Sequence, residues 1–305
     1  MSVPPPILTL TGNLLGERTF DFDHWEIGKT QRAARETFQV GGKGINVSKM
    51  LHRRGAPTTA LCFTGGDTGA ECETWLRRQG FSHRAFRGGR ASRAGLVVRS
   101  GSQPETTFLG PDVAPDAASV RACAGFLNSC AAGEILAVCG SVPGWAAGDF
   151  DPLRAALARW IGRGVLAADS YGPPLAWLVD QPLALVKINA VELRTLFPDE
   201  AAPAPVEQLL REAVVRWRAR NWIVTDGANP VWFCAEGGAP ASIAPPEVSE
   251  VSATGSGDVL FACVLDYFFR QRKPLGQAVA AALPFAAANA AHPGIAEFPE
   301  PAARG

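Results

Sequence analysis

Short apolar runs alternate with longer amphipathic segments over most of this chain. The runs have the length of strands, and each is followed by a segment whose apolar residues recur with helical spacing. This alternation predicts a mostly parallel β-sheet covered by helices. Strands are expected at 7–11, 59–63, 135–139, 165–169, 185–188, 222–225 and 231–235. Helices are expected at 49–54, 68–79, 115–131, 152–161, 191–196, 205–220, 259–269 and 275–291.

The alternation is interrupted twice, at about residues 11 to 37 and 88 to 112. Segments 13–20, 21–26, 95–99 and 105–108 resemble strands with no helix between them. Two such insertions can pair into a small sheet, and over the carboxyl ends of parallel strands that sheet would form a lid on a ligand site. Since no repeat, linker or shift in composition separates two units, a single domain over residues 1–305 is expected.

Composition excludes several classes of function. The 305 residues contain 29 Lys and Arg against 29 Asp and Glu, so net charge gives no reason to expect a nucleic-acid or membrane partner. The seven cysteines form no C-x-x-C pair and the four histidines are scattered, which favours small core thiols in a reducing compartment over a zinc site. Neither a leader nor an apolar run of membrane-spanning length is present, so a cytoplasmic location is expected.

A small-residue turn, Gly255-Ser-Gly-Asp258, leads into an apolar segment that is expected to be helical. Glycines let a ligand approach the backbone, and the first amides of a helix lack intrahelical partners, so this turn can bind an anion. The charge of Asp258 would repel a phosphate unless it takes part in chemistry or holds a metal. A base beside a phosphate site suggests phosphoryl transfer. The alternative is an ordinary loop with an acid favoured by the helix dipole.

A second glycine-rich stretch, Gly41-Gly-Lys-Gly-Ile-Asn46, is not a P-loop, because Gly44 follows Lys43 where a P-loop has Ser or Thr. Its backbone would admit a polyol, and Asn46 can bond adjacent hydroxyls through both its donor and its acceptor. The alternative is a loop in which Asn46 caps a helix.

The third motif, Lys187-Ile-Asn-Ala-Val-Glu192, spans the end of an expected strand and the start of a helix. Asn189 and Glu192 would face one side, where a carboxylate could orient Mg²⁺ through water near a triphosphate. The same spacing is that of a capping box. Thr225-Asp-Gly227 ends another strand and would either hold a nucleotide or form a simple turn.

The order of these motifs resembles that of the PfkB-type, or ribokinase-like, carbohydrate kinases, and the resemblance runs nearly end to end. The segments 7–13, 139–144, 186–193 and 254–258 are most similar to the branch that contains 1-phosphofructokinase and tagatose-6-phosphate kinase. The resemblance implies a three-layer α/β/α core with a small β-sheet lid. It also implies the use of ATP and Mg²⁺ and transfer of the γ-phosphoryl group to a sugar hydroxyl.

The resemblance also assigns roles. Asp258 would be the base, and the amides of Gly255, Ser256 and Gly257 would neutralise charge on the transferring group. The nucleotide would be bound by Lys187, Asn189, Glu192, Thr225 and Gly227, with Glu192 acting indirectly on Mg²⁺. The sugar would face Asn13, Glu17, Gly42, Lys43 and Asn46. Lys29 and Arg93, from the lid, are the candidates for a substrate phosphate. Lids of this family often pair across two subunits, which predicts a homodimer.

Several positions depart from the family pattern. Glu17 stands where the branch has Asp, Gly95 and Leu109 replace lid asparagines, and Ser252-Ala253 precedes the turn where Asn or Asp with Thr is usual. These changes affect acceptor recognition more than the reaction. We therefore expect a sugar-phosphate kinase. The alternatives are a kinase of an unphosphorylated sugar or nucleoside, and a catalytically idle sensor of sugar phosphates or nucleotides.

Overall fold

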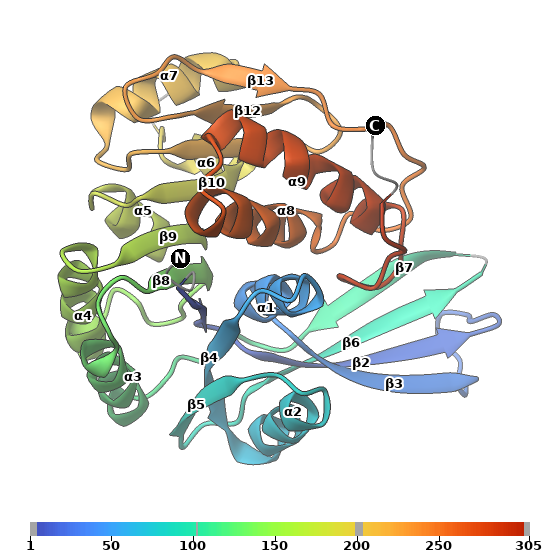
Figure 1. Ribbon diagram of the computed structural model, residues 1–305. Helices are drawn as coiled ribbons and strands as arrows, with labels where there is room; N and C mark the ends of the chain where they lie inside the picture. The colour runs from blue at the N-terminus through green and yellow to red at the C-terminus, as the bar shows by residue number, and fades with distance from the viewer. Residues whose placement is uncertain (1–4, 102, 199–203, 302–305) are drawn as a thin grey trace.

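The larger of two sheets forms the centre of the molecule. In the computed structural model, which describes residues 5–101, 103–198 and 204–301, it has nine strands in the order β13-β12-β11-β10-β9-β8-β1-β4-β5 (Figure 1). All neighbours from β11 to β5 pair in parallel, whereas β12 is antiparallel to both of its neighbours. The mostly parallel sheet is therefore confirmed. Its strands are β1 (Ile7–Thr11), β4 (Thr58–Gly65), β5 (His83–Gly88), β8 (Ile135–Gly140), β9 (Val165–Ser170), β10 (Leu185–Asn189), β11 (Trp222–Thr225), β12 (Val231–Cys234) and β13 (Ala241–Ile243).

Helices cover both faces of this sheet because its central strands are apolar on both sides. Every residue of β8 is buried, and alternate residues enter different cores: Leu136 packs with the core under α3 to α7, and Ile135 with the core under α1, α8 and α9. The three-layer α/β/α arrangement is confirmed. The helices are α1 (Lys43–Arg53), α2 (Gly66–Arg78), α3 (Ala117–Ser129), α4 (Asp151–Ile161), α5 (Pro173–Val179), α6 (Ala190–Thr195), α7 (Val206–Arg216), α8 (Ser256–Val264) and α9 (Leu275–Ala290), with η1 (Gly148–Phe150) before α4 and the π-helical turn η2 (Leu265–Arg270) after α8.

The smaller sheet projects beside the larger one, in the order β3-β2-β6-β7 (Figure 1). It pairs β2 (Leu15–Phe22) and β3 (Arg35–Gly41) with β6 (Arg93–Ser100) and β7 (Gln103–Leu109), so strands from both insertions meet as expected. The expected strand at 21–26 was wrong: β2 ends at Phe22, and the antiparallel return strand begins only at Arg35. Gly28, with φ of 81°, lies in the loop between them.

Two helices begin earlier than their apolar patterns predict. Helix α1 starts at Lys43 rather than residue 49, and α8 starts at Ser256 rather than residue 259. Glycines lower helix propensity, but burial of residues 44–51 of α1 overrides that preference. Conversely, the helix expected at 205–220 ends at Arg216, and β5, β13 and α5 were not expected. The glycine-rich motifs are therefore the first turns of helices.

Within the ranges that the structure describes, no helix combines the length and the apolarity needed to cross a bilayer. The ends of the expected single domain, residues 1–4 and 302–305, lie outside the described residues.

Candidate active site

A cavity of about 850 Å³ opens at the carboxyl ends of the parallel strands. Its lining includes the ends of four strands: Thr11 of β1, Gly140 of β8, Asn189 of β10 and Thr225 of β11. The small sheet contributes the wall on one side, through β2, β3, β6 and β7. This volume is that of a small-molecule site, and its position is the usual one for ligands of parallel α/β folds.

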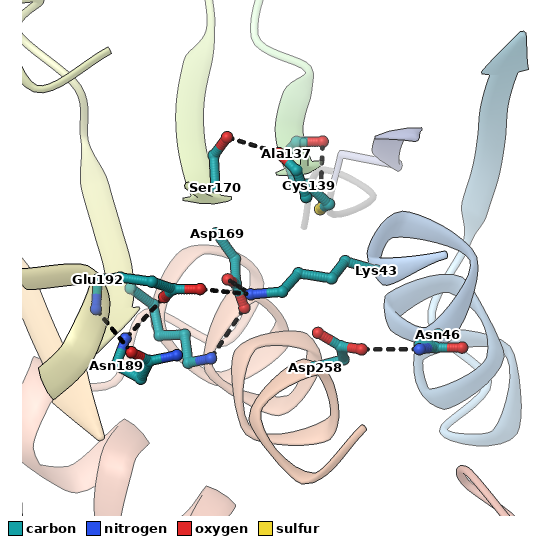
Figure 2. A network of polar contacts seen from close by, with 11 residues as sticks. Lys43, Asn46, Ala137, Cys139, Asp169, Ser170, Asn189, Glu192 and Asp258 are labelled. Atoms are coloured by element: carbon teal, nitrogen blue, oxygen red, sulfur yellow. Dashed lines mark hydrogen bonds and ion pairs between the residues drawn. The ribbon is translucent and has the colours of Figure 1, made fainter. Parts of the chain in front are cut away.

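The turn before α8 contributes an acid to this cavity. Gly255 is the N-cap and has φ of 77°, so the chain turns through a left-handed residue before the helix begins. Asp258 lies in the first turn and is 5% exposed, and Asn46 donates from Nδ2 to its Oδ2 at 2.7 Å (Figure 2). Burial, followed by the charge of Asp169, raises the pKa of Asp258 to about 6. A carboxylate with that pKa is ionised at neutral pH and suited to accept a proton.

A buried asparagine holds the same turn in place. Asn289, on α9, donates from Nδ2 to Thr254 O at 3.0 Å and to Ser256 Oγ at 3.1 Å, and its Oδ1 accepts from Ala296 N at 2.9 Å. The amide of Ser256 donates to Ala253 O at 3.2 Å. The amides of Gly257 and Asp258 follow in the first helical turn, where no intrahelical acceptor is available. The turn therefore presents amides to the cavity from a fixed backbone.

Two lysines and two acids meet beside Asp258. Lys43 Nζ lies 2.7 Å from Asp169 Oδ1 and 3.2 Å from Glu192 Oε1 (Figure 2). Lys187 Nζ lies 2.9 Å from Asp169 Oδ2. Burial opposes ionisation of Asp169, but the two ammonium groups, Lys187 first, lower its pKa. Burial likewise disfavours the charge on Lys43, but the charges of Asp169, Asp258 and Glu192 outweigh it and raise its pKa. Lys43 is thus held as a cation near the turn before α8, and Lys187 lies beside the same carboxylate.

Asn189 and Glu192 form the capping box that was the alternative interpretation of their spacing. Asn189 caps α6, its Oδ1 accepts from Glu192 N at 2.8 Å, and Glu192 Oε2 accepts from Asn189 N at 2.8 Å. The other carboxylate oxygen of Glu192 faces Lys43. Capping therefore occupies one oxygen of Glu192 and leaves its charge inside the cluster. Among the described residues, no group of three His, Cys, Asp or Glu side chains is arranged to hold a metal ion.

The residues expected at the acceptor end separate into two groups. Asn13, Glu17 and Arg93 line the cavity. Arg93 donates to Asp112 Oδ1 at 3.1 Å, and its Nε is buried without a hydrogen-bond partner among the described residues.

Lys29 is not part of the cavity wall: it pairs with Glu26 at 2.5 Å, and its side chain is 66% exposed. The two candidates for a substrate phosphate, Lys29 and Arg93, therefore do not meet at the cavity of one chain, because Lys29 lies in the loop between β2 and β3.

The other expected site residues come together. Glu192 does not line the cavity itself, but it contacts Lys43, which does. Those that line the cavity are Asn13, Glu17, Gly42, Lys43, Asn46, Arg93, Lys187, Asn189, Thr225, Gly227, Gly255, Ser256, Gly257 and Asp258.

Sequence reasoning missed four residues of the site: Gln39, Lys49, Asp169 and Asn289. Asp169 carried a usable signal, since an acid at the carboxyl end of an expected parallel strand points to the ligand edge of the sheet. The other three carried none, because their partners lie on other elements and no local pattern pairs them.

The three-layer core, the small sheet beside the cavity and the acid in the first turn of α8 define a ribokinase-like fold. Solved structures with this fold include phosphofructokinase-2 from Escherichia coli in complex with potassium, with a TM-score of 0.86 at 22% identity over 95% of this chain and 94% of that chain. Ribokinase from Thermotoga maritima has a TM-score of 0.73 at 18% identity over 96% of each chain.

Sequence comparisons agree with the fold. The chain is 26% identical over 258 residues to 1-phosphofructokinase from Bacillus subtilis (strain 168), covering 84% of this chain and 83% of the relative. It is 28% identical over 260 residues to 1-phosphofructokinase from Borreliella burgdorferi, covering 84% and 82%. The model of the pfkB family of carbohydrate kinases matches residues 14–303. The chain belongs to that family, which confirms the resemblance seen in its motifs.

Proposed function

We propose that this protein transfers the γ-phosphoryl group of ATP to a hydroxyl of a sugar phosphate. The observation that carries the proposal is the pairing of Asp258 with Asn46 at 2.7 Å, beside a helix N-terminus, the buried Lys187 and the partly exposed Lys43 in one cavity. A base, a set of amide donors and fixed cations are the groups that phosphoryl transfer requires. The names of the two 1-phosphofructokinase relatives support a phosphorylated sugar as the acceptor.

Each group has a distinct task in this reaction. Asp258 accepts the proton of the attacking hydroxyl, and Asn46 orients that carboxylate through the hydrogen bond to Oδ2. The amide of Gly257 faces the negative charge of the transferring group, with Lys43 and Lys187 beside it, whereas the amide of Ser256 is already bonded to Ala253 O. The nucleotide occupies the end of the cavity lined by Thr225 and Gly227. The sugar occupies the end under the small sheet, next to Asn13, Glu17 and Gly42.

The donor set fits a Mg²⁺ ion held through water. Asp169 Oδ1 and Glu192 Oε1 already face the ammonium group of Lys43, so a Mg²⁺ ion bound directly to these oxygens would displace Lys43. Mg²⁺ commonly keeps several waters and binds through one or two carboxylates and the substrate phosphates. We assign Glu192 to that indirect role; the ion would supply charge neutralisation on the phosphates.

Arg93 is the residue that we expect to distinguish a phosphorylated acceptor from an unphosphorylated one. Its side chain lines the cavity, and its Nη1 donates to the exposed carboxylate of Asp112, so the guanidinium can also donate to a bound phosphate. Arg93→Ala should raise the KM for a sugar phosphate by about tenfold or more, with a change of less than about threefold for ATP. Kinetics with fructose 1-phosphate, fructose 6-phosphate, tagatose 6-phosphate, fructose and adenosine make this comparison.

That acceptor panel also separates the alternatives. Turnover of fructose or adenosine alone, unaffected by Arg93→Ala, would favour a kinase of an unphosphorylated sugar or nucleoside. Tight ATP binding without turnover of any acceptor would favour a catalytically idle sensor. Arg154→Ala is the matched control, since Arg154 forms an ion pair with Asp151 and does not line the cavity.

We also propose that two chains associate through their small sheets. Phe108 and Leu109 on β7 are 55% and 54% exposed, and Ile27 in the loop after β2 is 91% exposed. Large apolar side chains exposed on a projecting sheet are typical of an interaction surface. Sedimentation should give about twice the chain mass of 32.2 kDa, and Ile27→Asp with Phe108→Asp should shift it toward the monomer. A monomeric wild type at micromolar concentration would contradict the dimer.

A further inference from the structure

Three side chains on one face of α1 line the cavity at intervals of three residues. Lys43 contacts Asp169 and Glu192, Asn46 contacts Asp258, and Lys49 follows one step further along the helix. Successive steps advance by about 4.5 Å along the helix axis. Lys49 therefore lies beyond the proposed base, on the side away from the phosphoryl-transfer groups and toward the small sheet.

Lys49 is linked to the small sheet by a chain of hydrogen bonds. Its Nζ donates to Gln39 Oε1 at 2.9 Å, and Gln39 Nε2 donates to Glu17 Oε1 at 2.5 Å. Glu17 on β2 lies directly opposite Gln39 on β3 in the register of the small sheet. All three residues line the cavity. The ammonium group determines the orientation of the Gln39 amide, because a lysine only donates hydrogen bonds and the amide oxygen must face it.

The ammonium group of Lys49 is buried, and burial of a charge is energetically unfavourable. The residue is 8% exposed, and its Nζ lies 5.4 Å from the centre of the Trp75 ring. Burial lowers its pKa to about 8, against the opposing charges of Glu17, Glu297 and Asp258. An apolar side chain of similar length would avoid this desolvation. The link to a carboxylate in the cavity wall gives the ammonium a role beyond packing.

We propose that Lys49 and Gln39 are positioning residues that hold the carboxylate of Glu17 for recognition of acceptor hydroxyls. This inference rests on the proposed function and specifies its acceptor end. With Oε1 bonded to Gln39, the remaining lone pairs of Glu17 accept hydrogen bonds from the acceptor. The acceptor it selects carries hydroxyl donors on the part of the molecule remote from the reacting hydroxyl. An acceptor that lacks these hydroxyl groups should bind much more weakly, because the free oxygen of the Glu17 carboxylate would then have no hydrogen-bond donor.

A double-mutant cycle on ligand binding tests this coupling. Calorimetric Kd values for fructose 6-phosphate and fructose 1-phosphate, without ATP, would be compared for wild type, Lys49→Met, Gln39→Met, Glu17→Gln and the two double variants with Glu17→Gln. We expect each Met variant to weaken binding of the better ligand by about tenfold. In the Glu17→Gln background, the same changes should have an effect within about twofold, because residues that act through one group are not additive.

Other measurements keep this test separate from folding and from the proposed function. Lys273→Met, outside the cavity wall, is the matched control and should bind like wild type. Nucleotide binding and melting temperature show whether a Met variant is folded. Losses that multiply with that of Glu17→Gln, unchanged binding in a folded Lys49→Met protein, or a wild type that binds neither sugar phosphate would overturn the inference. Turnover of the wild-type enzyme with ATP is measured independently and decides the proposed function alone.

Discussion

Asp258→Asn is expected to lower kcat for phosphoryl transfer by about 10²- to 10⁴-fold while the protein stays folded. The amide keeps the shape of the side chain but cannot accept the proton of the attacking hydroxyl. Steady-state rates with the best acceptor of the panel, together with ATP binding, measure the effect. Near-normal turnover in a folded, ATP-binding variant would remove Asp258 from the chemistry.

The pH dependence of the wild-type enzyme provides a check on the same carboxyl. Its pKa is raised to about 6, by burial first and the charge of Asp169 second, and the base must be deprotonated to act. We expect kcat/KM to be flat above that pH and to fall about tenfold per unit below it. Because folding raises this pKa, the ionised form disfavours the folded state above about pH 6. Asp258→Asn should therefore melt at the same temperature as wild type or higher at pH 8.

Asp169→Asn should have the largest effect on stability. Asp169 is fully buried and pairs with Lys43 and with Lys187, whose side chain is 3% exposed. Removing the shared carboxylate leaves the buried Lys187 without its ion-pair partner and Lys43 with Glu192 alone, and the free energy of unfolding should fall by about 3–5 kcal/mol. Chemical denaturation of the two proteins at pH 7 measures this loss. Turnover should fall as well, because the lysines would no longer be held beside the turn.

An exposed aspartate gives the control for that measurement. Asp151 pairs with Arg154, but its side chain is 75% exposed, so Asp151→Asn should cost less than about 1 kcal/mol. Equal losses for the two substitutions would show that the buried cluster does not hold the site together. The pKa of Asp169 is lowered by the two lysines, so its contribution to stability is present at neutral pH. It is lost as acidification protonates the carboxyl, and Asp169→Asn should lack this acid-dependent loss.

Local residue patterns predicted most of the scaffold, because the pattern of apolar residues within a short stretch of sequence indicates each strand or helix. The run 135–139 is apolar at every position, and it forms a central strand buried on both faces. Segments 95–99 and 105–108 alternate, and they pair in a sheet with one face on the cavity. Boundaries were less accurate at glycines. The starts of α1 and α8 depend on packing and on open amides, which propensity does not describe.

The lid residues show the limit of motif reasoning. Lys29 and Arg93 had the same kind of evidence, a basic residue in a lid segment, yet only Arg93 lines the cavity. The difference arises from the loop between β2 and β3, which places Lys29 beside Glu26 and exposes its side chain to solvent. A loop has no periodic pattern from which its path can be inferred.

The sequence alone determined the order of the elements, the motifs at 41–46, 187–192 and 255–258, and the place of Asp258 at the start of a helix, because hydrophobic period and glycine placement act over a few residues. Only the tertiary structure decided which side chains meet. Asp258 is 212 residues from Asn46, Lys43 is 126 from Asp169, and Gln39 joins Glu17 to Lys49 across two strands and a helix. Those contacts depend on the parallel strands ending at one edge, and they determine the orientation of these side chains and raise the pKa of Asp258.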